Sequence, residues 1–281
     1  MQNQKPGLNV LAVESFLADI AQNVAGNRVA INVLLPIGVD PHGFEPTPSD
    51  LRRVADANVL IVNGAGFEDF LDDLLKNAGG KRVVIEASAG LTARNPRANE
   101  SANQHAADPH FWFDPNHAIK YVENIREGLT RADPDGAAIY RANADAYSAQ
   151  LRDLDAWIAD QIKTIPPAQR QLVTDHDTFG YFADRYDFQI VGMIVPSVHT
   201  GATPSAQEMA RVIERIKQTR ARAIFLEAGA NAQLAQQIAQ ESGARVITGL
   251  YTHSLTDARG NAPTYIEMMK FNTRLIVDAL K

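Results

Sequence analysis

The 281-residue chain contains no cysteine. This absence excludes disulfide bonds, thiolate metal ligands and cysteine nucleophiles, so any bound metal must be held by His, Asp or Glu. No apolar run approaches the ~20 residues that a membrane-spanning helix needs. Lys and Arg form no basic run and the net charge is −6, so nucleic acid is not an expected partner. The opening "MQNQKPGLNV" lacks the apolar segment of a secretory signal.

The composition that remains is typical of a soluble globular protein, with 45% hydrophobic and 21% charged residues. The first part of the chain alternates short apolar segments such as "LNVLAVE" and "NVLIVNG" with amphipathic ones such as "SFLADIAQNVAG". The part after Pro166-Pro167 repeats the alternation, for example in "FQIVGMIV" and "SAQEMARVIERIKQT". Strands that alternate with helices predict an α/β fold with mainly parallel sheets.

A long helix is predicted between these two parts. It opens near Asp133-Pro134, keeps its apolar residues at a helical period, and stops at Pro166-Pro167. We therefore expect two lobes, each a mainly parallel sheet flanked by helices, joined by one long rigid helix. The expected boundaries are residues 1–132 for the N-terminal α/β lobe, 133–165 for the linking helix and 166–281 for the C-terminal α/β lobe.

Two Asp-Pro-His sequences stand out, in "GVDPHGFEP" and "AADPHFWFDP". They place His42 and His110 on stiff turns, and His176 in "LVTDHDTFGYF" likewise follows a predicted strand. Ligands of open α/β sheets bind outside the carboxyl ends of the strands. A lone histidine at such a junction is more often a hydrogen-bonding residue, but three of them favour a metal site.

A carboxylate would complete a tetrahedral site with three imidazoles. Asp257 is the preferred candidate because it lies on a polar loop after the last predicted strand, and Glu227 at the end of "AIFLE" is the competitor. His253, in "YTHSLTDARG", is a minor candidate. His105 is placed in a mobile polar loop over residues 91–107, His117 in a first helical turn, and His199 near the expected cleft without a ligand signal.

Five stretches carry a family resemblance, in this order along the chain: "DPHGFEPTPSDL", "DPHFWFDP", "TDHDTFGYFADRY", "TPSAQEMARVIERIK" with "AIFLE", and "SLTDARGNAPTYIEMMKFN". Together they resemble the metal-binding (cluster A-I) solute-binding proteins of bacterial ABC transporters for zinc and manganese. The resemblance implies two α/β lobes, one rigid connecting helix and a metal site in the cleft between the lobes. The implied ligands are His42, His110, His176 and Asp257. We assign Glu227 a supporting hydrogen-bonding role.

The resemblance also bears on which metal is bound. Manganese members commonly carry Glu where this chain has His176, and zinc members carry His. Imidazole suits Zn(II), whereas Mn(II) favours a richer set of oxygen ligands. We therefore expect high-affinity capture of Zn(II), with Mn(II) as the alternative. The loop before Asp108 lacks the long His-rich insertion of many zinc members, so metal capture by that loop is not expected.

The partner implied by the resemblance is the membrane permease of a metal ABC transporter, and a periplasmic metallochaperone is a further candidate. A monomer is expected. The expected location is the periplasm, with a lipid anchor at the cell surface as the alternative. An enzyme is not expected, because the sequence has no HExxH motif and a complete ligand set leaves no position for water. The rival from another class is a zinc hydrolase with Glu227 as its base, and a surface adhesin is a third interpretation.

Overall fold

The computed structural model describes residues 7–94, 108–195 and 203–281. The chain divides into two compact units, each built from three chain segments. Unit 1 comprises Met1–Leu91, Pro115–Leu154 and His253–Ile266, and unit 2 comprises Thr92–Asp114, Asp155–Thr252 and Glu267–Lys281.

Unit 1 contains a four-stranded parallel sheet in the order β2-β1-β3-β4. Both central strands are buried along their whole length, which explains why they appear in the sequence as continuous apolar runs rather than alternating ones. The strands are β1 (Val10–Ala12), β2 (Ile31–Val33), β3 (Val59–Val62) and β4 (Val83–Glu86).

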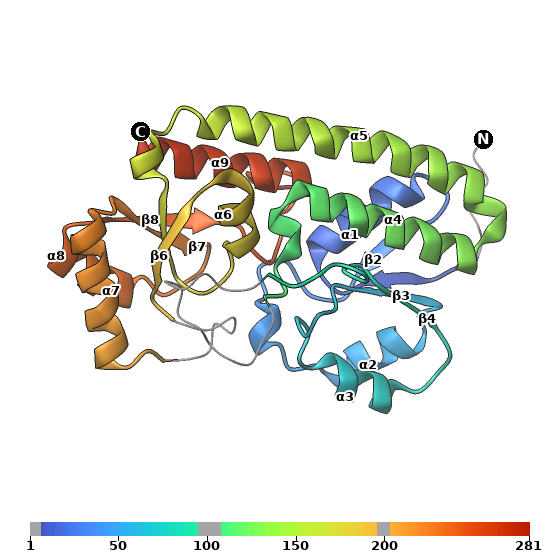
Figure 1. Ribbon diagram of the computed structural model, residues 1–281. Coiled ribbons are helices and arrows are strands. Elements are labelled where there is room, and N and C mark those ends of the chain that lie inside the picture. Colours follow the sequence, from blue (N-terminus) through green and yellow to red (C-terminus); the bar gives the residue numbers. More distant parts are fainter. Residues whose placement is uncertain (1–6, 95–107, 196–202) are drawn as a thin grey trace. The chain divides into compact units, whose positions relative to one another are not determined.

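Helices cover both faces of this sheet (Figure 1). Residues Leu11 and Leu60 pack on one face with Val54 of α2 and Leu74 of α3. Helices α1 and α4 contact each other and the other side of the strands. These helices are α1 (Ser15–Ala25), α2 (Pro48–Ala55), α3 (Leu71–Ala78) and α4 (Pro115–Ala132).

Unit 2 contains a second four-stranded parallel sheet, in the order β6-β5-β7-β8. In both sheets the first strand in the chain lies between the second and the third, so the two units share one topology. The strands are β5 (Gln171–Thr174), β6 (Gln189–Met193), β7 (Ala223–Glu227) and β8 (Arg245–Leu250).

One face of this second sheet packs on two helices, through Ile216 of α7 and Ile238 of α8. Leu172 and Phe225, which alternate with the residues of that face, are also fully buried, as in a sheet covered on both sides. The helices of unit 2 are α6 (Gly180–Tyr186), α7 (Ala206–Thr219), α8 (Gln233–Ser242) and most of α9 (Tyr265–Leu280).

The long helix α5 (Ala137–Ile162) joins the two units in the chain and follows a short 3-10 turn, η3 (Pro134–Gly136). Its 26 residues correspond to about 39 Å at 1.5 Å per residue. The expected fold class is thus confirmed: two parallel sheets flanked by helices, with a long connecting helix. None of the helices in the described ranges is long and apolar enough to cross a membrane.

One helix differs from expectation. The sequence predicts a helix over residues 67–79, but α3 begins only at Leu71. The preceding residues turn instead, with Ala65 and Gly66 at φ of 54° and 75°. The Glu68 carboxylate there accepts the backbone N–H groups of Asn63 and Gly64, at 2.5 and 3.0 Å. These bonds satisfy the end of β3 and replace the first helical turn.

Candidate metal centre

The strand order of each sheet defines where a ligand is expected to bind. The connections from neighbouring strands diverge beside β1 in unit 1 and beside β5 in unit 2, and such switch points at carboxyl ends are the usual ligand sites of open sheets. His42 follows β2, and His176 follows β5 by two residues. Each unit therefore has a histidine that follows the carboxyl end of a strand.

His42 lies in a 3-10 turn, η1 (Pro41–Gly43), that its own sequence enforces. The Asp40 side chain caps the turn by accepting the His42 backbone N–H at 2.9 Å, and Pro41 fixes the backbone between them. The imidazole is half-buried and meets the edge of the Phe67 ring, with ring centroids 5.1 Å apart.

His253 is the second imidazole of unit 1. Its ring centroid lies 4.9 Å from that of His42, with the ring planes nearly perpendicular, and its Nδ1 lies 4.0 Å from Asp40 Oδ1. The following residues hold this loop in place, because Ser254 Oγ accepts the Gly38 N–H and Ser15 Oγ accepts the Leu255 N–H, both at 2.8 Å. His253 is buried, with 5% of its surface exposed, whereas His42 is only half-buried.

His110 is fully buried in unit 2, directly before a 3-10 turn, η2 (Phe111–Phe113). Asp108 Oδ1 accepts its backbone N–H at 3.0 Å and lies 2.9 Å from its Nδ1. The indole of Trp112 meets the imidazole edge-on, with ring centroids 5.2 Å apart, and donates its N–H to the carbonyl of Thr252 at 3.1 Å. The aromatic run after Asp-Pro-His therefore packs the second histidine into the unit.

His176 completes a pair with His110, at a ring-centroid distance of 5.7 Å. Its Nδ1 faces two carboxylates, with Asp175 Oδ1 at 3.3 Å and Glu227 Oε1 at 3.7 Å. Its Nε2 meets the hydroxyl of Thr178. Nitrogen and carboxylate atoms of Asp175, His176 and Glu227 lie within 4.8 Å of one another, so Glu227 lies beside the His176 ring.

Acids around the two sites have shifted pKa values. Burial, and then the negative charge of Asp177, raises the pKa of Asp108 well above its ordinary value, while the His110 N–H and the charge of Arg94 oppose the rise. In unit 1, burial raises the pKa of Glu68 to about 7 against the N–H donors of Asn63 and Gly64. Asp108 lies beside His110, where a cation would offset its charge.

Asp257 occupies a different setting from the four histidines. Its side chain is exposed and accepts the Arg259 backbone N–H at 2.8 Å, in a turn of its own loop. His117 lies in the first turn of α4 as expected, at a partly exposed position. His105 and His199 lie outside the described residues, as does the expected mobile loop from residue 95 onwards.

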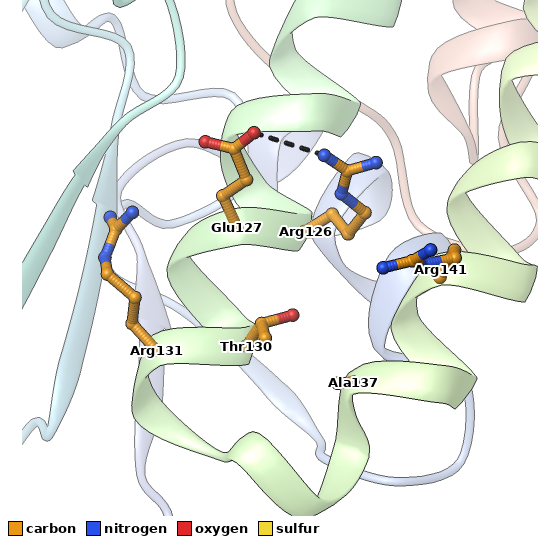
Figure 2. A pocket seen from close by; sticks show the side chains of 6 residues that line it. All are labelled: Arg126, Glu127, Thr130, Arg131, Ala137 and Arg141. Atoms are coloured by element: carbon orange, nitrogen blue, oxygen red, sulfur yellow. Dashed lines mark hydrogen bonds and ion pairs between the residues drawn. The ribbon is translucent and has the colours of Figure 1, made fainter.

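A hollow of about 450 Å³ on unit 1 is separate from these groups. It lies where α4 ends and α5 begins, and Figure 2 shows the ion pair of Arg126 and Glu127 beside it, 3.1 Å long. None of the candidate ligands lines it, so the hollow is not the metal centre. The lining residues are Arg126, Glu127, Thr130, Arg131, Ala137 and Arg141.

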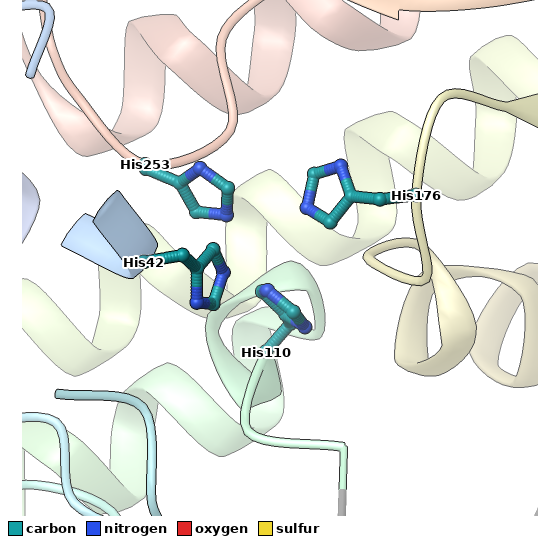
Figure 3. A group of neighbouring side chains, drawn as sticks. All are labelled: His42, His110, His176 and His253. Atoms are coloured by element: carbon teal, nitrogen blue, oxygen red, sulfur yellow. The ribbon is translucent and has the colours of Figure 1, made fainter. Parts of the chain in front are cut away.

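Figure 3 draws the four imidazoles that the two units contribute: His42 and His253 from unit 1, and His110 and His176 from unit 2. Neutral imidazoles bind borderline divalent ions such as Zn(II). Sequence reasoning ranked His253 below Asp257, although His253 comes only three residues after β8 ends. His253 could have been ranked higher by the same feature as the other three histidines, namely its closeness to the carboxyl end of a strand.

The chain is similar to known proteins of one family. Residues 10–279 match the family described as zinc-uptake complex component A, periplasmic. The manganese-binding lipoprotein MntA of Halalkalibacterium halodurans is 37% identical over 274 residues, which cover 98% of this chain and 89% of that protein.

Two solved structures share the fold along nearly the whole chain. The Mn-bound periplasmic metal binding protein of Candidatus Liberibacter asiaticus has a TM-score of 0.86 at 28% identity, covering 97% of this chain and 99% of that one. The periplasmic zinc binding protein TroA of Treponema pallidum has a TM-score of 0.86 at 28% identity, covering 96% and 98%. The chain therefore belongs to the zinc-uptake complex component A family of cluster A-I solute-binding proteins, which are not enzymes but the extracytoplasmic metal-binding components of ABC uptake transporters.

Proposed function

We propose that this protein captures Zn(II) with high affinity and delivers it to an ABC permease for import. The choice of metal rests on two pairs of histidines. The ring centroids are 4.9 Å apart for His42 and His253 in unit 1, and 5.7 Å apart for His110 and His176 in unit 2. Three of the four imidazoles are buried and the fourth is half-buried. A set of nitrogen ligands without sulfur favours Zn(II) over Mn(II), which prefers oxygen.

The proposed ligands are His42, His110 and His176, as the sequence predicts, with His253 as the fourth. Four imidazoles fill a tetrahedral zinc site and leave no position for water, which suits a carrier. Asp257 remains the alternative fourth ligand, but its exposure and its bond to the Arg259 N–H favour His253. Glu227 is assigned a supporting role, because Oε1 lies 3.7 Å from His176 Nδ1 while Oε2 accepts the Thr252 hydroxyl.

Manganese is the second candidate cargo. It is favoured by the 37% identical relative, which is named for manganese, and by a structural relative solved with bound Mn. The histidine pairs of this chain argue against it, because a site with four nitrogen donors gives Mn(II) none of the oxygen ligands it prefers.

The proposed setting is the periplasm, where the monomeric protein meets its permease and, as a further candidate partner, a metallochaperone. A lipid-anchored form is the alternative, since a relative is a lipoprotein. Both settings place the metal site outside the cytoplasmic membrane, so the choice between them does not alter the proposed chemistry.

A competition titration of the metal-free protein tests the proposal. We expect one Zn(II) per chain, with Zn–N distances of about 2.0–2.1 Å by X-ray absorption, and displacement of bound Mn(II) by Zn(II). His42→Ala should lose most of the affinity, while His117→Ala, which removes a histidine on α4, should bind like the parent. Retention of Mn(II) against excess Zn(II) would reassign the cargo, and equal affinity of both variants would refute the site.

A further inference from the structure

Asp108 is tied to His110 through two bonds to a single carboxylate oxygen. Oδ1 accepts the backbone N–H of His110 at 3.0 Å and lies 2.9 Å from its Nδ1. A bound cation would favour the ionised form of Asp108. An ionised carboxylate can only accept hydrogen bonds, so Nδ1 then carries the ring proton in this pair. The lone pair of His110 is then on Nε2, on the far side of the ring.

A platform of side chains fixes Asp108 in turn, all within unit 2. The Tyr181 hydroxyl donates to the Asp108 carbonyl at 2.7 Å and accepts the Arg94 backbone N–H at 3.2 Å. Arg94 Nη1 lies 4.0 Å from Asp108 Oδ2, and its Nε donates to Asp184 at 3.0 Å. Both Arg94 and Asp108 have almost no exposed side-chain surface.

Gly180 provides the space for this platform. A Cβ atom at that position would stand 2.5 Å from Asp108 Oδ2 and 2.6 Å from Arg94 Nη1. Any larger residue would displace the side chains of Asp108 and Arg94. The first residue of α6 must therefore be glycine for Asp108 to keep its position.

The two Asp-Pro-His sequences are used differently. Asp40 accepts the backbone N–H of His42, but the ring that approaches its Oδ1 is that of His253, at 4.0 Å. Asp108 binds both the backbone and the ring of its own histidine. The second sequence therefore fixes a ring orientation as well as a turn.

The geometry points to Asp108 as a positioning residue for metal binding, which holds His110 in the tautomer that offers Nε2 to the ion. This inference rests on the proposed function, because it gives His110 the role of a ligand. Carboxylates that orient ligating imidazoles typically contribute 10–100-fold to metal affinity. Arg94, Tyr181 and Gly180 act through Asp108 and not on the metal.

The test compares Asp108→Asn with Asp187→Asn, which removes one charge from an exposed position of the same unit. We expect Zn(II) affinity to fall about 10–100-fold in the first variant and to stay within about twofold of the parent in the second. Nitrogen-15 NMR of the imidazoles provides a readout that a merely structural role would not change. In the zinc-loaded parent, His110 should carry its proton on Nδ1, and Asp108→Asn should lose this fixed tautomer.

Tyr181→Phe is a second variant that keeps the ring and removes only the hydroxyl from the platform. A several-fold loss of affinity at unchanged thermal stability supports the inference, even if Asp108→Asn fails to fold. Two results would overturn the positioning role and leave the proposed function standing. The first is parent-like affinity and an unchanged Nδ1 proton in Asp108→Asn. The second, which applies if Asp108→Asn does not fold, is parent-like affinity in Tyr181→Phe. A parent that binds no metal refutes both.

Discussion

A short sequence, Asp-Pro-His, explains much of the site at the scale of single residues. In both copies the aspartate accepts the N–H of the histidine two positions later, at 2.9 and 3.0 Å, and the proline between them has no N–H to compete. The turn is therefore encoded locally, which is why His42 and His110 could be singled out from the sequence. The backbone N–H of His176 also donates to an aspartate, at 3.1 Å, but this aspartate is Asp175, the residue directly before it.

The fourth histidine could not be ranked in this way. The contact between His42 and His253 joins residues far apart in the chain, and it depends on Ser15 and Ser254 holding the loop after β8. No local pattern encodes that contact. Asp257 was preferred because a carboxylate was expected to complete the ligand set. The sequence does not give the distance between that carboxylate and the histidines.

The assignment of His253 predicts a clear difference between two variants. His253→Ala should weaken Zn(II) binding by at least 10-fold, since it opens one of four ligand positions. Asp257→Ala should bind like the parent, because its carboxylate accepts the Arg259 N–H on an exposed loop. Calorimetry at one pH and salt concentration measures both. The reverse order of affinities would make Asp257 the ligand.

At the scale of elements, strand positions were predictable and the turns between them were less so. Continuous apolar runs identified β1 and β3 because both strands are buried on two faces. The late start of α3 was not predictable, because Glu68 leaves the helical pattern to bind the backbone at the end of β3. Such a bond depends on the tertiary position of one carboxylate.

The ends of β1 and β3 also bring two acids together in the interior of unit 1. Glu14 is 1% exposed, and its carboxylate oxygens have no hydrogen-bond partner within the described part of the chain. Burial, and then the charge of Glu68, raises the pKa of Glu14 well above its ordinary value. Burial likewise raises the pKa of Glu68 to about 7.

This pair predicts a pH dependence of stability. Between pH 4.5, the ordinary glutamate pKa, and about pH 7, the folded protein binds more protons at these acids than the unfolded chain does. Their contribution to the free energy of unfolding therefore falls as the pH rises through that window. Glu14→Gln removes one of the titrating groups and keeps its shape. At pH 8 it should stabilise the metal-free protein by roughly 1–3 kcal/mol, and the gain should shrink at pH 5.

Guanidinium unfolding of parent and variant at the two pH values measures this difference. Glu127→Gln, at an exposed position of the same unit, is the matched control and should show no pH-dependent gain. A gain for Glu14→Gln that is equal at pH 5 and pH 8 would contradict a protonation effect.

At the scale of the whole molecule, metal binding and stability are linked. A ligand that binds only the folded protein, at 100 times its dissociation constant, adds about 2.7 kcal/mol to the free energy of unfolding. We expect Zn(II) to raise Tm by several degrees and a chelator to reverse the rise, measured by calorimetry. His42→Ala should abolish the rise, and an undiminished shift in that variant would place the stabilising ion elsewhere.

The division of the chain into three segments per unit has a consequence for how the protein can be dissected. A fragment ending at Leu154 would carry the sheet of unit 1 but would lack His253 and the serine-anchored loop that follows it. It would also carry Thr92–Asp114, with the Asp108–His110 pair cut off from Tyr181 and Gly180. No single cut releases either unit whole, so half-molecules expressed from one breakpoint are expected to be incomplete. Only the uninterrupted polypeptide is expected to fold and to bind the metal.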